Sequence, residues 1–140
     1  ISKSCTHPSL EIRTANCAPT MVFRGSASEN EVSLGELLLV LGGSGGPKII
    51  TAVMQVFMNH LFLGMPLFDA TVHPRIHDQL IYNGAAVTAV EVSELETGEA
   101  ISVPNRTLAA LRSRHHNLLD IDYTGTVQAI SVDLETMEIR

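Results

Sequence analysis

LLLVLGGSGGP, residues 37–47, is the stretch that decides how this chain folds. Its apolar first half predicts a strand over residues 36–41, because a run this apolar is typical of a strand covered on both faces. Small residues fill positions 42–46, and Pro47 suits the first turn of a helix. Residues 48–63 follow without Gly or Pro, with apolar side chains spaced by threes and fours. The stretch therefore predicts a strand, a glycine turn and an amphipathic helix in immediate succession.

Further elements are predicted on both sides of this unit. Gly64 is expected to end the helix as its C-cap, and Pro74 is expected to stop a second, short helix. The other predictions are a strand at 17–24, a polar loop at 25–35, the short helix at 66–72, a strand at 86–92, a helix at 104–116, and strands at 121–132 and 137–139 around Gly125 and Asp133. This mixture of strands and helices predicts an α+β or layered α/β fold.

The composition is that of a folded domain or of part of one. Of the 140 residues, 45% are hydrophobic, which is enough to bury a core. The net charge is −6 and the basic residues are scattered, so we expect no nucleic-acid partner. The chain begins at Ile1 without the apolar run of a signal peptide, so we expect its natural start further upstream. Cys5 and Cys17 are too few for a disulfide framework, and the sequon at Asn105 permits glycosylation if the chain is secreted.

The glycine turn fits two roles equally well. Small residues between a buried strand and a helix let the backbone approach a ligand closely. The helix start adds free N–H groups and the positive end of the helix dipole, which together stabilise a negatively charged oxygen. A tight strand-to-helix turn without any ligand needs the same residues.

Three other motifs compete for these glycines. A P-loop requires Gly-Lys-Ser/Thr at the helix start, which residues 46–48 do not supply, and the dinucleotide-binding spacing fails at its last glycine. The nucleophile elbow G-x-S-x-G is satisfied, which makes Ser44 a candidate nucleophile. In such a triad the Ser is followed by an Asp and then by a His, and Asp69 or Asp78 followed by His115 fits this order. However, the strands that precede the elbow in that fold are missing.

A longer series of residues extends the glycine turn into a family signature. It runs from Leu39 to Pro47 and continues with Ile49-Ile50-Thr51, Gln55, Asn59, Gly64-Met65, Asp69-Ala70, Pro74-Arg75-Ile76-His77 and Gln79. The helix end at Arg114-His115, the strand at 125–130 and the upstream Ala18-Pro19-Thr20 belong to the same series. These residues resemble the small subunit of gamma-glutamyltranspeptidases, also called glutathione hydrolases. The resemblance divides the chain into a poorly matching segment at 1–16 and a small-subunit fragment at 17–140.

The resemblance implies an α+β fold that is an incomplete part of the αββα sandwich of N-terminal-nucleophile hydrolases. In that family a precursor cleaves itself, and the new N-terminal Thr of the small subunit attacks the gamma-glutamyl amide of glutathione. The acyl group then passes to water, an amino acid or a peptide. The resemblance further implies no cofactor and no metal, the large subunit of the same precursor as partner, and an extracellular, cell-surface or vacuolar location.

Four positions take family roles by resemblance. Gly45 and Gly46 are expected to supply the backbone N–H groups of the oxyanion hole. The serine pair that binds the substrate carboxylate aligns with Ala15 and Asn16, of which only Asn16 can donate a hydrogen bond. The nucleophilic Thr of the family lies several tens of residues before the glycine turn, upstream of Ile1. We therefore expect no activity from this polypeptide alone.

Two other classes of function stay open. The loss of both serines fits a non-catalytic structural domain of a degenerate homologue, and the elbow motif fits a serine hydrolase that uses Ser44.

Several other polar residues are expected to be structural. His73 and His77 are four apart and suit a metal site on one helix face, but Pro74 interrupts that helix and no Cys lies nearby, so packing is favoured. Arg75 is expected to be a partly buried ion-pair partner rather than a substrate clamp. His115 and its neighbour His116 suit the negative end of a helix.

Overall fold

The strand–turn–helix unit predicted from the sequence is the centre of the fold. The computed structural model describes residues 19–24, 36–94, 97–133 and 139 of the chain. Strand β2 (Leu37–Ser44) leads into the 3-10 turn η1 (Gly46–Lys48) and then into helix α1 (Ile49–Leu61). The strand is longer than predicted, because Gly42, Gly43 and Ser44 continue it by pairing with another strand, β7.

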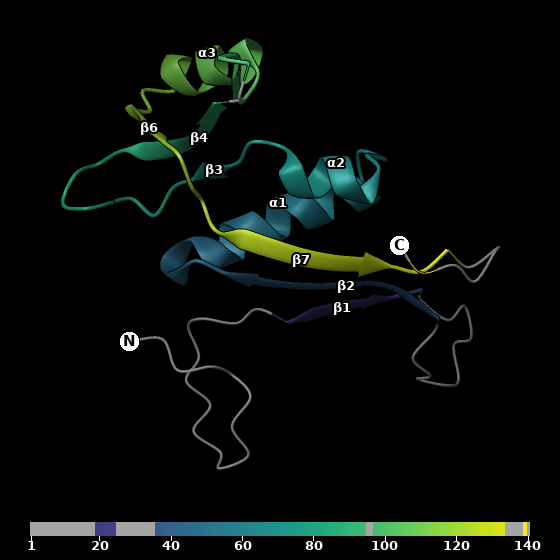
Figure 1. Cartoon of the computed structure of the whole chain (residues 1–140). Coiled ribbons are helices and arrows are strands. Elements are labelled where there is room, and N and C mark those ends of the chain that lie inside the picture. The colour runs from purple at the N-terminus through teal and green to yellow at the C-terminus, as the bar shows by residue number, and fades with distance from the viewer. Residues whose placement is uncertain (1–18, 25–35, 95–96, 134–138, 140) are drawn as a thin grey trace.

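Two sheets carry the rest of the chain (Figure 1). The first sheet has the order β1-β2-β7, with β1 (Thr20–Phe23) and β7 (Thr126–Ser131) both antiparallel to β2. Helices α1 and α2 (Leu67–Val72) lie on one face of it. The second sheet contains β3 (Ile76–His77), β4 (Thr88–Glu94) and β5 (Ala100–Ser102), while β6 (Leu118–Ile121) pairs in parallel with β4 and helix α3 (Asn105–Ser113) packs beside β6. Sequence reasoning did not predict β3 or β5, and it placed the start of the last long strand after most of β6.

The main core lies between the first sheet and α1. Alternate residues of β2, Leu39 and Leu41, are buried against Ile49, Val53 and Val56 of the helix. This arrangement follows from the two periods, because i and i+2 face the same way on a strand while i, i+4 and i+7 share a helix face.

The second face of the first sheet is also apolar. Met21, Val40 and Ile130 stand opposite one another across its three strands. Met21 is 63% exposed and Ile130 is 51% exposed. The sequence predicted that β2 is covered on both faces. Among the described residues, only the face toward α1 is fully covered. A sheet with two apolar faces and one described helix layer is what an incomplete sandwich presents.

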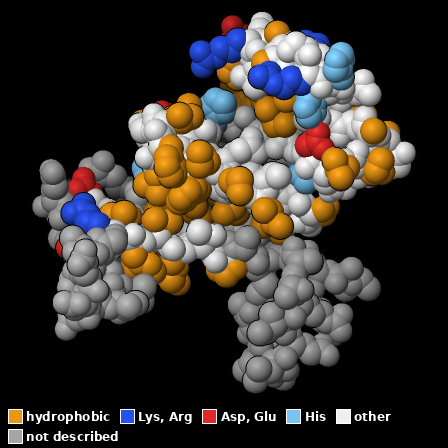
Figure 2. Space-filling view, turned by 180° about the vertical axis from the view of Figure 1, so that it is seen from behind, with side chains coloured by type: hydrophobic (Ala, Val, Ile, Leu, Met, Phe, Trp, Pro, Cys, Tyr) orange, Lys and Arg blue, Asp and Glu red, His pale blue; other side chains and the backbone are white. Residues whose placement is uncertain are grey.

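The outer side of α1 carries further apolar residues. Ile50, Met54 and Met58 recur every four residues and line a groove of about 320 Å³ together with Thr20, Val53 and Phe57. Figure 2 shows hydrophobic side chains gathered over the helix layer, seen from behind. None of the described helices has both the length and the hydropathy that a bilayer span requires.

The helix ends differ in detail from their predictions. The C-cap of α1 is Phe62 rather than Gly64, because the N–H groups of Phe62 and Leu63 both donate to the Met58 carbonyl, and Gly64 follows with a φ of 69°. Helix α2 ends at Val72, as predicted, but begins at Leu67, because Pro66 is its N-cap rather than its first residue. Of the strand predicted at 137–139, only Ile139 is described, and it forms a bridge with Val132. The loop predicted at 25–35 lies outside the described residues.

Two neighbouring isoleucines test this core. Ile49 is 1% exposed and Ile50 is 69% exposed, although they are adjacent in the same helix. We expect Ile49→Ala to lower the free energy of unfolding by about 2–5 kcal/mol, and Ile50→Ala to change it by no more than about 0.5 kcal/mol. Urea unfolding of both variants measures the difference, and equal losses would contradict the packing of α1 described here.

Candidate oxyanion site at the glycine turn

The backbone at the glycine turn holds two amide groups that could receive an anionic oxygen. Gly45 has a φ of 140° and Gly46 a φ of 64°, so both occupy conformations that favour glycine. Within the part of the chain that the structure describes, no protein acceptor takes the N–H of either residue. Both residues are half-buried and stand where η1 and α1 begin. Two free N–H groups at the positive end of a helix form a suitable cradle for a negatively charged oxygen.

Gly125 fixes the position of this turn from the opposite strand. A Cβ atom placed on Gly45 would lie 2.7 Å from the Cα of Gly125, and one placed on Gly125 would lie 2.7 Å from the Ser44 carbonyl oxygen. Real Cβ contacts are not this short, so both positions require glycine. The two backbones therefore lie in direct contact at the ends of β2 and β7.

Lys48 ties the start of α1 to the loop that precedes Gly125. Its Nζ donates to the Tyr123 carbonyl oxygen at 2.6 Å and lies 5.6 Å and 5.8 Å from the ring centroids of Tyr123 and Tyr82. The Tyr123 hydroxyl in turn shares a 2.8 Å hydrogen bond with Thr126 Oγ1. A cation held over two aromatic faces is stabilised by their quadrupoles. It also places positive charge two residues after the free amides.

His77 is a buried structural histidine. Its Nδ1 lies 2.8 Å from Thr51 Oγ1 and its Nε2 lies 2.8 Å from Gln79 Oε1. Because the Gln79 amide nitrogen donates to the Ile81 carbonyl, its oxygen faces His77 as an acceptor. Nε2 therefore donates to Gln79, while the Thr51 hydroxyl also donates to the Lys48 carbonyl at 3.0 Å, so the ring bridges α1 and the segment after β3. The suggested partner His73 lies in a different element, after α2, where its Nδ1 contacts the Pro74 carbonyl.

Arg75 is the buried ion-pair partner that the sequence predicted. Its Nε lies 3.1 Å from Glu91 Oε2, and both side chains are almost wholly buried. Glu91 also accepts a hydrogen bond at 3.1 Å from the backbone N–H of Thr124, the residue before Gly125. Sequence reasoning missed Glu91 and Thr124, since no local pattern shows which distant backbone a strand carboxylate contacts.

The nucleophile elbow is not assembled around Ser44. Ser44 is the last residue of β2 and pairs with Thr126, and it lacks the positive φ that the strained turn of an elbow imposes. Asp78 binds His116 at 3.2 Å rather than His115, and also accepts from Thr88. His115 instead has a φ of 66° just after α3. Among the described residues, no hydrogen bond joins the Ser44 side chain to a base.

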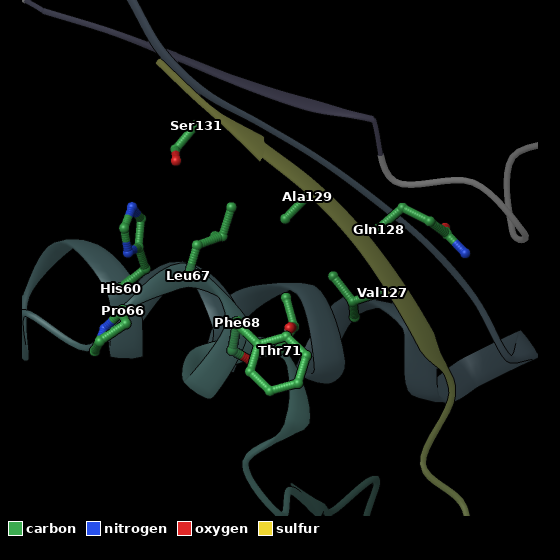
Figure 3. Close-up of a pocket in the computed structure, with 9 residues that line it drawn as sticks. All are labelled: His60, Pro66, Leu67, Phe68, Thr71, Val127, Gln128, Ala129 and Ser131. Atoms are coloured by element: carbon green, nitrogen blue, oxygen red, sulfur yellow. Dashed lines mark hydrogen bonds between the residues drawn. The ribbon is translucent and has the colours of Figure 1, made fainter. Parts of the chain in front are cut away.

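Two other features lie apart from the turn. A cavity of about 650 Å³ separates α2 from β7. Figure 3 shows Leu67 and Phe68 on one side of it and Val127 and Ala129 on the other. No residue of the glycine turn lines this cavity. Ala15 and Asn16, the positions of the family serine pair, lie outside the described residues.

Comparison with known proteins connects the chain to one family. The sequence profile described as Gamma-glutamyltranspeptidase matches residues 14–139. Glutathione hydrolase 3 of Arabidopsis thaliana is 38% identical over 96 residues, which cover 69% of this chain and 15% of that protein. Glutathione hydrolase proenzyme 1 of Schizosaccharomyces pombe is 39% identical over 67 residues, 48% of this chain and 10% of that protein. The chain thus spans less than a sixth of the length of either relative.

Solved structures show the same fold. A mutant of the Helicobacter pylori gamma-glutamyltranspeptidase superposes with a TM-score of 0.66 at 25% identity, covering 90% of this chain and 57% of that one. The Pseudomonas nitroreducens gamma-glutamyltranspeptidase complexed with L-DON superposes with a TM-score of 0.64 at 24% identity, covering 95% and 60%. The fold is therefore that of part of an N-terminal-nucleophile hydrolase.

The contact between Gly45 and Gly125 is testable with a matched pair of glycines. Gly125 and Gly98 both have positive φ, at 118° and 80°, but only a Cβ on Gly125 meets other atoms within 4 Å. Gly98→Ala is expected to destabilise the chain by about 1–2 kcal/mol through its backbone alone. Gly125→Ala should cost about 3 kcal/mol or more, because a steric clash adds to that term. Thermal unfolding distinguishes the two, and equal shifts in Tm would refute the close approach.

Asp78 should make stability depend on acid pH. Hydrogen bonds from the Thr88 hydroxyl, from the Leu80 N–H and from His116 hold the pKa of Asp78 below its ordinary 3.8, although burial opposes them. A carboxyl with a lowered folded pKa binds fewer protons than the unfolded chain, so its contribution is full above pH 3.8 and is lost as pH falls through the lowered value. Asp78→Asn should therefore flatten the unfolding free energy against pH below 3.8. An unchanged acid profile would show that Asp78 is not stabilised in this way.

Proposed function

The chain belongs to the gamma-glutamyltranspeptidase family, and we propose that it forms part of the catalytic domain of an enzyme that cleaves the gamma-glutamyl amide of glutathione and related compounds. The acyl group would pass to water, an amino acid or a peptide. The observation that carries this proposal is the pair of amides at Gly45 and Gly46, whose N–H groups have no acceptor among the described residues. Both glycines belong to the residues that carry the family resemblance.

The turn would act when the substrate carbonyl becomes tetrahedral. Attack by the nucleophilic Thr, which the family supplies upstream, converts the carbonyl oxygen into an alkoxide. The N–H groups of Gly45 and Gly46 would donate to that oxygen, and the helix end and Lys48 would add positive potential. Collapse of the intermediate expels the amine and leaves an acyl-enzyme. Each such donor is typically worth about 3 kcal/mol in the transition state.

The remaining contacts of the site are part of the same proposal. Asn16 would donate to the substrate carboxylate in place of a family serine, with Ala15 beside it contributing no hydrogen bond. The large subunit of the same precursor would be the partner, which the proenzyme name of the Schizosaccharomyces pombe relative supports. An extracellular, cell-surface or vacuolar location stays a prediction from the family.

A non-catalytic structural domain is the second candidate. It is favoured by Ala15, which lacks a hydroxyl where the family has serine. The serine hydrolase alternative is disfavoured by Ser44, which has an ordinary strand conformation and no histidine partner among the described residues.

Turnover of a chromogenic gamma-glutamyl anilide tests the proposal. A protein that contains these residues together with an upstream Thr nucleophile should release the chromophore, while the 140 residues alone should not, because the proposal places the nucleophile outside them. Gly45→Ala, which forces the turn away from Gly125, should lower kcat by about 100-fold or more.

Two controls accompany this measurement. Gly98→Ala also carries alanine at positive φ, but in open space, and should keep its kcat. Ser44→Ala should retain turnover, whereas its complete loss would support the serine hydrolase. A well-folded complete protein that releases no chromophore would refute the enzymatic proposal and support the structural domain.

A further inference from the structure

Glu91 is a charged residue in the interior of the second sheet. It is 6% exposed, and the two residues before it in β4, Ala89 and Val90, are fully buried. Removing a carboxylate from water costs several kcal/mol unless its oxygens find donors. The hydrogen-bond donors around Glu91 therefore show which parts of the fold its carboxylate holds together.

Four N–H groups saturate this carboxylate. Oε2 accepts from the backbone N and the Nε of Arg75, both at 3.1 Å. Oε1 accepts from Arg75 Nη2 at 3.3 Å and from the backbone N of Thr124 at 3.1 Å. An ionised carboxylate offers about four lone-pair sites, so each oxygen of Glu91 is fully used. Three of the four donors belong to Arg75, and the fourth is the backbone N–H of Thr124.

That fourth donor lies where the chain crosses between the two sheets. Strand β6 pairs in parallel with β4, with Ile121 opposite Glu91, and residues 122–125 then carry the chain into β7 of the first sheet. Lys48 holds the same crossing from the other side through the Tyr123 carbonyl. The crossing is thus fastened by a buried carboxylate on the second sheet and by the cation that follows the glycine turn.

The crossing ends on the turn itself. Gly125 follows Thr124 directly, and its backbone is in contact with Gly45. A displacement of Thr124 would move Gly125, one peptide unit further on, and Gly125 would in turn move Gly45 through their backbone contact. Arg75 has no equivalent link to the turn among the described residues, because its side-chain bonds join only the residue before β3 to Glu91 of β4.

We propose that Glu91 is a positioning residue for the glycine turn: its buried carboxylate holds the Thr124–Gly125 backbone against Gly45 and so fixes the direction of the Gly45 and Gly46 N–H groups. This role in catalysis rests on the proposed function. The structural coupling of Glu91 to the turn does not depend on catalysis, so it can be measured in the 140-residue chain.

Amide exchange and amide chemical shifts in the 140-residue chain test the coupling. Glu91→Gln removes the negative charge that strengthens all four hydrogen bonds and replaces one saturated oxygen by an NH₂ group that cannot accept. The Thr124 amide should exchange at least about tenfold faster relative to amides of α1, since hydrogen bonds to charged groups carry more than ordinary ones. The amide resonances of Gly45 and Gly46 should move with it.

A matched variant separates positioning from general destabilisation. Arg75→Lys disturbs the same buried ion pair but leaves Glu91 to accept from Thr124, so it should shift amides of β3 and β4 and leave Gly45 and Gly46 in place. Glu36→Gln, which removes half of the exposed pair between Arg24 and Glu36, should change none of these signals. If Glu91→Gln does not fold, Glu91→Asp retains the charge for Arg75 while shortening the reach toward Thr124 by about 1.5 Å.

The complete protein supplies the catalytic readout. Glu91→Gln should lower kcat at least about tenfold and change KM less than about threefold, because an oxyanion donor acts in the transition state. Unmoved Gly45 and Gly46 resonances in the Glu91 variants, or equal movement in Arg75→Lys, would overturn the coupling. Absence of gamma-glutamyl turnover in the unmutated complete protein would instead overturn the proposed function, and the amide measurements would still decide the coupling.

Discussion

A side chain on either Gly45 or Gly125 would bring a Cβ atom within 2.7 Å of the opposite backbone. The pairing of β2 with β7 depends on this close approach, because the ladder continues to Ser44 and Thr126 immediately beside it. The approach also sets how the chain leaves the sheet, since a φ of 140° at Gly45 turns it into η1 and α1. The main core between β2 and α1 can form only when that turn has this shape.

The buried ion pair of Arg75 and Glu91 lies where the chain crosses between the sheets, and Glu91 also binds the Thr124 N–H beside Gly125. A buried ion pair such as that of Arg75 and Glu91 is weak evidence for stability, because desolvation offsets much of its attraction. Two buried polar atoms beside it, Arg75 Nη1 and Thr124 Oγ1, have no partner among the described residues, which adds to the cost. Well-packed apolar residues would fill the space at lower cost. Such apolar residues could not accept the hydrogen bond from the Thr124 N–H, which Glu91 does.

The sequence was informative where a local period governs the structure. The run at 37–41 and the apolar spacing after Pro47 predicted β2 and α1, and prolines marked both ends of α2. Strands β3 and β5 are two and three residues long, too short to show an alternation. Gly42 and Gly43 were predicted to belong to the turn, but they continue β2 because they pair with β7, although glycine is depleted in strands. Glu91 carries no local signal, because its partner Thr124 is 33 residues away.

The two glycines of the candidate site differ in what their presence implies. Gly45 is required by packing against Gly125, so any chain that keeps this fold keeps it, whether or not it binds substrate. Around Gly46 a Cβ would meet nothing within 4 Å, and its φ of 64° is one that another residue adopts at a cost of about 1–2 kcal/mol. Packing therefore explains Gly45 fully and Gly46 only in part. A residue without a side chain lets a ligand approach the backbone closely. Gly46 is thus the residue of the proposed oxyanion site whose identity packing explains least.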